Sequence, residues 1–201
     1  MGVLKESPGP NAAHLCIDMQ RLFSAEGPWP TPWMERVLPN VVKLVERAPE
    51  RTLFTRFLPP EKPEDAPGRW RAYYDKWPNA TRKRLDPELV NLLPALGRFV
   101  PPASVFDKPV YSAFANCELD RCLRARGIDT LIVSGSETDV CVLSSALGAV
   151  DHGYRVIVAC DAVCSSSDES HDALIDLFRR RFDVQIEASE AGEILDAWRP
   201  G

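Results

Sequence analysis

The feature that most constrains the fold of this chain is the alternation of short aliphatic segments with helical patterns. Six segments are rich in β-branched or aliphatic residues, at 14–18, 51–57, 103–108, 130–135, 155–160 and 184–188. Strands that alternate with helices favour a parallel sheet covered on both faces. The alternation therefore predicts a three-layer α/β/α fold of the Rossmann-like type, with a six-stranded, mostly parallel sheet.

Two of the predicted helices carry clear start signals. Asp86-Pro87 places a capping residue before a proline at the first helical position. Ser166 and Glu169 have the spacing of a capping box, which predicts a helix start at this point. Beyond this box, apolar residues recur at helical intervals, at Ala173, Leu174, Leu177 and Phe178.

The length of 201 residues suits one globular domain, because domains commonly run to about 100–200 residues. The sequence has no internal repeat and no linker, so we expect a single domain over residues 1–201. Residues 58–80 are the irregular part, in which a proline-rich stretch precedes Trp70, Tyr73, Tyr74 and Trp77. A long insertion of this kind is usually functional or mobile. Both a substrate lid and a subunit contact fit this segment.

Charge and hydropathy argue against several classes of partner. The net charge is −5, and the densest basic runs, at 82–84 and 179–181, are typical of solvated helix faces. Nucleic acid is therefore not expected as a partner. The sequence contains no apolar run near the ~20 residues that span a membrane, and residues 1–15 contain no apolar stretch of signal-peptide length. We expect a cytoplasmic protein whose six cysteines, with no CxxC pair, are free thiols.

Three chemically reactive side chains follow predicted strands. In sheets of this kind ligands bind outside the carboxyl ends of the strands. Asp18 follows the first strand, Lys108 ends the third, and the turn with Cys141 follows the fourth. We therefore expect a carboxylate, an ammonium and a thiol to meet in one crevice. Each of the three residues also fits a structural role when it is considered alone. Asp18 could cap the following turn, Lys108 could be an exposed lysine of a loop, and Cys141 could be a small buried residue.

The blocks "LCIDMQRLF", "VFDKPVYSAF" and "LIVSGSETDVCVLSSALGAVDHGYRVIVACDAV" occur in this order along the chain. With them the sequence resembles the isochorismatase-like cysteine hydrolase superfamily, which includes nicotinamidases, N-carbamoylsarcosine amidohydrolases, ureidoacrylate hydrolases and biuret hydrolases. The resemblance implies the three-layer fold, a catalytic triad, and a cis peptide bond between Ser136 and Glu137. The implied triad is Asp18, Lys108 and Cys141.

The resemblance also implies a mechanism of acyl transfer. Cys141 is expected in the first turn of a helix, where the dipole and the free N–H groups favour an anion. Asp18 takes the thiol proton, while Lys108 keeps Asp18 ionised. The backbone N–H groups of Glu137 and Cys141 are expected to form the oxyanion hole. Asp139, early in the helix, is expected to face away from the pocket.

The sequence departs from the nicotinamidases at their metal site. They carry an Asp-x-His motif just after the second strand, where this chain has "TRFLPP" with Phe57 and Pro59. We therefore expect neither a metal nor another cofactor. The three histidines, His14, His152 and His171, are expected to be structural.

Four residues are candidates for substrate binding. Arg56 follows the second strand and fits either a clamp for a substrate carboxylate or packing against a neighbouring acid. Glu137 fits either recognition of N–H groups on a ureido or cationic substrate, or an outward side chain. Trp70 is the first choice in the aromatic cluster, and Phe23 completes the set.

The function expected from these residues is a metal-independent cysteine hydrolase that cleaves a C–N bond of a small carboxamide, ureido or carbamoyl substrate through a thioester. One alternative is an isochorismatase-type vinyl-ether hydrolase, which would not need Cys141. Another is a catalytically silent binding domain of the same fold. The resemblance further implies a homodimer or a homotetramer.

Overall fold

The sheet of the computed structural model, which describes residues 4–201, has six parallel strands in the order β3-β2-β1-β4-β5-β6. Residues 1–3 lie outside the described residues. They belong to the expected single domain and to the N-terminal stretch that was considered for a signal peptide. The strands are β1 Ala12–Ile17, β2 Thr52–Phe57, β3 Ser104–Lys108, β4 Thr130–Ser136, β5 Arg155–Cys164 and β6 Ile186–Ser189. The predicted fold class is confirmed, and every predicted strand exists with its ends shifted by a few residues.

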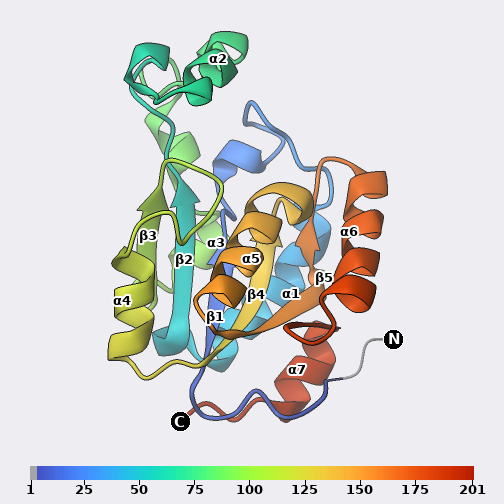
Figure 1. Cartoon of the computed structure of the whole chain (residues 1–201). Helices are drawn as coiled ribbons and strands as arrows, with labels where there is room; N and C mark the ends of the chain where they lie inside the picture. The colour runs from blue at the N-terminus through green and yellow to red at the C-terminus, as the bar shows by residue number, and fades with distance from the viewer. Residues whose placement is uncertain (1–3) are drawn as a thin grey trace.

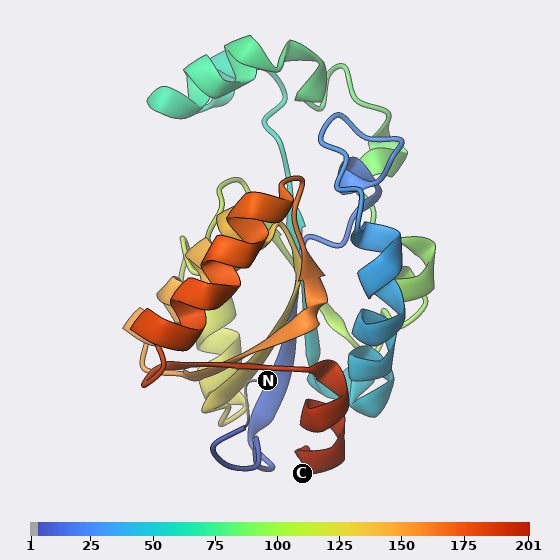
Figure 2. The same cartoon turned by 90° about the vertical axis from the view of Figure 1, so that its right-hand side faces the viewer.

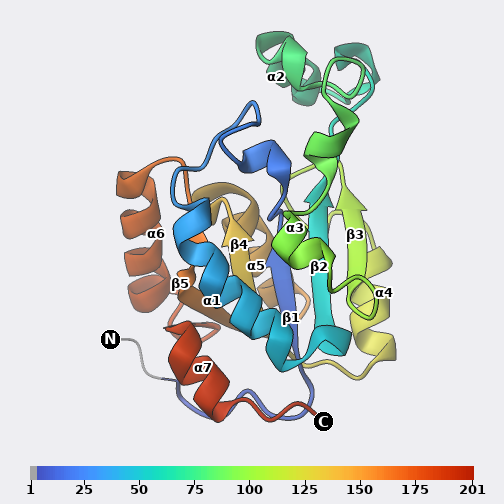
Figure 3. The ribbon, with the colours of Figure 1, turned by 180° about the vertical axis from the view of Figure 1, so that it is seen from behind.

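Helices cover both faces of this sheet. The α-helices are α1 Met34–Arg47, α2 Arg69–Lys76, α3 Pro94–Gly97, α4 Glu118–Ala125, α5 Leu143–Asp151, α6 Asp168–Arg181 and α7 Ala191–Ala197. Helices α4, α5 and α6 lie on one face (Figure 1), and α1, α3 and α7 lie on the other (Figure 3). Along β1, Leu15 and Ile17 pack into the core under α4–α6, whereas Cys16 packs into the core under α1 and α7. Successive side chains of a strand point to opposite faces, so a strand covered on both sides is apolar throughout.

The chain direction places all strand carboxyl ends at one edge. The strand order reverses between β1 and β4, whose neighbours lie on opposite sides of this pair. At such a switch point the loops after adjacent strands diverge and leave a crevice. Asp18 and the turn that begins at Glu137 follow β1 and β4 directly, so the topology itself puts them at the crevice.

The helix signals are partly confirmed. Asp86 caps the short 3₁₀ helix Pro87–Val90 by accepting a hydrogen bond from the Glu88 amide at 2.9 Å. The predicted cap at Ser166 is wrong by one residue, because the Ser167 hydroxyl accepts from the Ser170 amide at 3.3 Å. The predicted apolar face of α6 also changes, because Ala173 and Leu177 are exposed. Its buried residues are His171, Leu174, Ile175 and Phe178.

The irregular segment extends beyond the carboxyl ends of the strands. Figures 1 and 2 show α2 and its flanking turns above the end of β2, outside the three layers. The buried Gln20 side chain holds both ends of this excursion, since it donates to the carbonyls of Phe57 at 3.1 Å and Val90 at 2.7 Å. Its carbonyl also accepts from the Phe57 amide at 2.7 Å. The excursion therefore has a fixed base next to β1.

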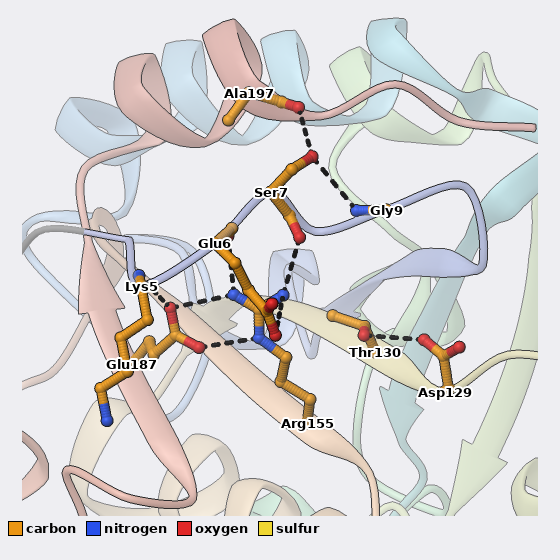
Figure 4. Close-up of polar contacts among 9 residues, drawn as sticks. All are labelled: Lys5, Glu6, Ser7, Gly9, Asp129, Thr130, Arg155, Glu187 and Ala197. Carbon is orange, nitrogen blue, oxygen red and sulfur yellow. Dashed lines mark hydrogen bonds and ion pairs between the residues drawn. The ribbon is translucent and has the colours of Figure 1, made fainter.

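The N-terminal segment is attached at the opposite end of the sheet. Arg155, the first residue of β5, donates to the carbonyls of Glu6 and Ser7 and forms a two-pronged salt bridge with Glu187 of β6 (Figure 4). These contacts lie far from the strand carboxyl ends. Within residues 4–201, no helix has both the length and the hydropathy needed to cross a membrane.

Candidate active site

Asp18 occupies a strained position at the end of β1. Its φ angle is 48°, in the left-handed region that costs a non-glycine residue free energy and is often found at functional sites. Thr55 of β2 holds it there, because the Thr55 hydroxyl donates to Asp18 Oδ1 at 2.6 Å. The Asp18 amide in turn donates to the Thr55 carbonyl at 3.2 Å. The carboxylate is fully buried.

Lys108 reaches the same point from the end of β3. Its Nζ lies 2.6 Å from Asp18 Oδ2 and donates to the Val110 carbonyl at 3.1 Å. Burial opposes the charge on this ammonium, but the negative charge of Asp18, followed by the interaction with Cys141, outweighs burial and raises the pKa of Lys108. The lysine is therefore a buried cation neutralised by its partner and not an exposed loop residue.

Cys141 completes the group from a π-helical turn, Thr138–Val142, between β4 and α5. The side chain is 4% exposed. Burial, and then the negative charge of Asp18, raise the pKa of Cys141 despite the opposing effect of Lys108. With its pKa raised, the thiol is protonated at neutral pH in the free protein. The structure brings Asp18, Lys108 and Cys141 together.

The turn before Cys141 has an unusual backbone. The peptide bond between Ser136 and Glu137 is cis. The amides of Val140 and Val142 donate to the Glu137 carbonyl at 3.1 and 3.0 Å, and the Cys141 amide between them does not. Amides in the first turn of a helix have no partner within the helix and are available to an anion.

The two acidic residues of this turn have different surroundings. Asp139 accepts a hydrogen bond from the Ser165 hydroxyl at 2.5 Å and does not line the cavity at Cys141. The Glu137 carboxylate accepts from the Ser166 amide at 3.1 Å, and Glu137 is one of the residues that line this cavity. Of the two acidic residues of this turn, Glu137 is therefore the one that lies at the cavity.

The cavity has a volume of about 270 Å³ and is lined by Phe23, Trp29, Phe57, Tyr73, Trp77, Tyr111, Glu137, Val140 and Cys141. Most of this lining is aromatic. Helix α2 contributes Tyr73, and Trp77 follows at its end, so the excursion forms one wall of the cavity within a single chain. A larger cavity of about 430 Å³ near the start of α1 contains none of the three reactive side chains.

Two of the four predicted substrate residues, Phe23 and Glu137, line the cavity. Trp70 does not line the cavity, but its ring packs against two rings that do, with centroid distances of 4.6 Å to Tyr111 and 6.2 Å to Phe57. Of the two roles considered for Arg56, a substrate clamp or packing against a neighbouring acid, this structure shows the second, and Arg56 does not line the cavity. Its guanidinium pairs with both carboxylate oxygens of Asp107 on β3, at 2.7 and 2.9 Å.

Sequence reasoning missed Trp29 and Tyr111, which come from connections that have no periodic signal. It named Tyr73 and Trp77 only as members of an aromatic cluster, in which contacts alone distinguish one ring from another. Trp29 lies at the centre, with ring centroids about 6 Å from Phe23, Phe57 and Tyr73. Only the aromatic composition of 70–77 gave a usable signal.

No metal-binding cluster is found among the described residues, counting groups of three or more histidine, cysteine, aspartate or glutamate side chains. Phe57 contributes its ring to the cavity wall. His14 is fully buried, where desolvation lowers its pKa to about 3. Its Nε2 lies 2.8 Å from the Ser134 hydroxyl, which fits a structural role.

Known proteins share this architecture and parts of this sequence. The chain is 29% identical to nicotinamidase 3 of Arabidopsis thaliana over 167 residues, which cover 82% of this chain and 78% of that protein. It is 36% identical to maleamate amidohydrolase of Pseudomonas putida over 81 residues, or 40% of this chain and 38% of that protein. In three of the curated matches the chain spans less than half of the relative's length, at 47%, 44% and 38%.

A solved cysteine hydrolase from Pseudomonas syringae pv. phaseolicola superposes with a TM-score of 0.82 at 24% identity. The superposition covers 98% of this chain and 96% of that one, and it shows that the two share their fold. The isochorismatase domain model matches residues 12–190. Since this match covers most of the 201 residues, the chain belongs to the isochorismatase family.

Proposed function

We propose that this protein is a metal-independent cysteine hydrolase that cleaves a C–N bond of a small carboxamide, ureido or carbamoyl compound. One observation carries the proposal: the Cys141 thiol lies at the cavity wall beside a buried Asp18–Lys108 pair whose atoms are 2.6 Å apart. A buried nucleophile beside a base that is itself oriented by a third group is the arrangement required for nucleophilic catalysis. The names of the amidohydrolases and the nicotinamidase that the chain resembles agree with it.

The proposed reaction begins with proton transfer, because the raised pKa of Cys141 keeps the thiol neutral in the free protein. Asp18 accepts the thiol proton while the sulfur attacks the substrate carbonyl carbon. Asp18 then gives this proton to the leaving nitrogen, so that ammonia or an amine departs and a thioester remains. Water, deprotonated by Asp18, hydrolyses the thioester to release the acid and restore the thiol.

The role proposed for Lys108 follows from its two contacts. Its ammonium neutralises Asp18 and also lies close enough to Cys141 for each charge to affect the other. The developing thiolate therefore forms beside a fixed positive charge. The proposed oxyanion hole is formed by the amides of Glu137 and Cys141, and one such donor can contribute about 2.7–4 kcal/mol in the transition state.

The two alternatives make different demands on the same residues. Vinyl-ether hydrolysis needs proton transfer but no thioester, so replacing Cys141 would leave it largely intact. A silent binding domain would have no use for the buried Asp18–Lys108 pair, and an ion pair left in a protein interior is costly to maintain. The burial of this pair next to a thiol favours the amide reaction.

The test is ammonia release from ureido acids, biuret-like compounds, simple carboxamides and nicotinamide, measured with the wild-type protein and with Cys141→Ala. Cys160→Ala is the matched control, because Cys160 lies in β5 and does not line the cavity. Release by the wild type and the control, but not by Cys141→Ala, supports the proposal. Isochorismate cleavage that survives Cys141→Ala would replace it with the ether reaction.

We infer in addition that the protein assembles as a homodimer or a homotetramer, an expectation that comes from the family resemblance alone. Light scattering coupled to size-exclusion chromatography measures the molar mass directly against the monomer mass of 22.4 kDa. A mass of one chain across the concentration range would contradict it.

A further inference from the structure

The cavity at Cys141 has an unusual charge pattern. Six of its nine lining residues are aromatic: Phe23, Trp29, Phe57, Tyr73, Trp77 and Tyr111. Glu137 is the only carboxylate in the lining, and within residues 4–201 this lining includes no lysine, arginine or histidine. Aromatic rings present a negative face, which attracts cations. The aromatic rings and Glu137 therefore both favour a positively charged ligand.

The cationic groups around the cavity do not reverse this balance. Lys108 lies over the Phe57 ring at 5.3 Å, but its charge is neutralised by Asp18. Arg56 is paired with Asp107. Lys76 lies 5.6 Å from the centroid of the Trp77 ring, and its side chain is exposed to water, which screens its charge.

The charge of Glu137 acts on both tyrosines of the cavity. Burial, followed by the interactions with Cys141 and Glu137, raises the pKa of the Tyr111 phenol. Burial and the charges of Tyr111, Glu137 and Cys141 raise the pKa of Tyr73 in the same direction. Both phenols are thus neutral at pH 7 and remain aromatic walls with hydroxyl groups. A carboxylate placed between these walls would meet Glu137 with no cation to balance it.

We propose that this cavity selects a flat carboxamide that carries a positive charge, held between the aromatic rings with its charge toward Glu137, and that it rejects carboxylate-bearing amides. The inference rests on the proposed function for the fate of the amide, but the charge preference is a property of binding. It follows from the placement of Glu137 among six rings and does not need turnover to be observed.

Three compounds of nearly the same shape isolate the charge. They are 1-methylpyridinium-3-carboxamide, which is a cation, 3-methylbenzamide, which is its neutral counterpart, and 3-carbamoylbenzoate, which is an anion. Their dissociation constants are measured by calorimetry with the Cys141→Ala protein, in which the thioester route is closed. We expect the cation to bind about tenfold more tightly than the neutral compound and the anion to bind most weakly.

Variants of Glu137 and Asp139 separate the carboxylate from the rings. Glu137→Gln, combined with Cys141→Ala, is expected to reduce the cation's advantage to about threefold, the part supplied by the rings. Asp139→Asn is the matched control, because this neighbouring acid is bonded to Ser165 and does not line the cavity. It should leave the order of the three affinities unchanged.

The result has two independent readings. If the neutral compound binds as tightly as the cation, if the anion binds best, or if none of the three binds, the charge preference is overturned, whatever the protein hydrolyses. Ammonia release by the wild type from the same three compounds is scored separately. Release from any of them that disappears in Cys141→Ala preserves the proposed function even when the charge preference fails.

Discussion

Asp18 has two opposing effects on Cys141. Its negative charge, together with burial, raises the pKa of the Cys141 thiol and so suppresses the thiolate in the free protein. Its carboxylate is also the base that we propose accepts the thiol proton. A buried base that holds the thiol neutral until a substrate arrives would limit side reactions of the sulfur, since the thiolate is the reactive form of cysteine.

Asp18→Asn should therefore separate reactivity from catalysis. Removing the base is expected to lower kcat/KM for an amide substrate by about 10²–10⁴-fold. Removing the negative charge is also expected to lower the pKa of Cys141, because Lys108 then has the thiolate as its remaining anionic partner. A small neutral alkylating reagent should thus modify Cys141 faster at pH 7 in the variant than in the wild type. Slower alkylation in Asp18→Asn would contradict this account of the thiol.

The contacts of Arg56 are determined by the neighbouring strand. Arg56 lies near the carboxyl end of β2, where the crevice is expected, but the register of β2 with β3 places it opposite Asp107. We expect Arg56→Ala to leave KM for any amide substrate within about twofold, because the side chain does not line the cavity. The free energy of unfolding should fall by about 0.5 kcal/mol, since a pair that is partly open to water contributes little. A tenfold rise in KM would instead support the role of Arg56 as a clamp for the substrate.

Among the helices, the start of α6 offers a direct comparison of two adjacent serines. The structure assigns the cap to Ser167, whose hydroxyl accepts from the Ser170 amide, whereas the sequence pattern favours Ser166. Ser167→Ala is expected to reduce the free energy of unfolding by about 1 kcal/mol. Ser166→Ala should cost less than half of that, because its contact with Glu137 uses the backbone amide. Chemical denaturation of both variants measures the difference, and equal losses would argue against the assigned cap.

The aromatic excursion depends on one side chain at its base. Gln20 bonds to Phe57, where the excursion leaves the sheet, and to Val90, where it returns. Gln20→Ala removes three hydrogen bonds and leaves buried backbone groups without partners. We expect faster amide exchange over 58–90, with exchange in β4 and β5 unchanged, and a higher KM through the loss of the wall that Tyr73 and Trp77 provide. Unchanged exchange over 58–90 would show that Gln20 does not anchor this segment.

The elements differ in how well the sequence predicts them. The strands are predicted because their segments are rich in aliphatic or β-branched residues, which is a local property. The reactive trio is predicted because it follows three of those strands. The cavity wall is not, because Trp29, Tyr73 and Tyr111 meet only through contacts between connections far apart in the chain. Ser167 was missed for a smaller reason: two adjacent serines satisfy a capping pattern nearly equally well.

At the scale of the whole molecule, one sheet serves two hydrophobic cores. The core under α1 and α7 contains Leu44, and the core under α4, α5 and α6 contains Leu123, both fully buried. The strands contribute to both cores through alternate side chains, so neither core can be lost while the other keeps an intact sheet. We infer that residues 4–201 unfold as one cooperative unit.

Tryptophan fluorescence tests this inference because most of the tryptophans report on only one of the two cores. Trp29, Trp33, Trp70 and Trp198, four of the five tryptophans, pack on or within the core that contains Leu44. Leu44→Ala and Leu123→Ala should each reduce the free energy of unfolding by about 2–5 kcal/mol. If the sheet couples the cores, Leu123→Ala lowers the fluorescence midpoint in denaturant as Leu44→Ala does, and circular dichroism gives the same midpoints. If Leu123→Ala shifts the circular dichroism transition but leaves the fluorescence midpoint in place, the two faces unfold separately and the sheet does not couple them.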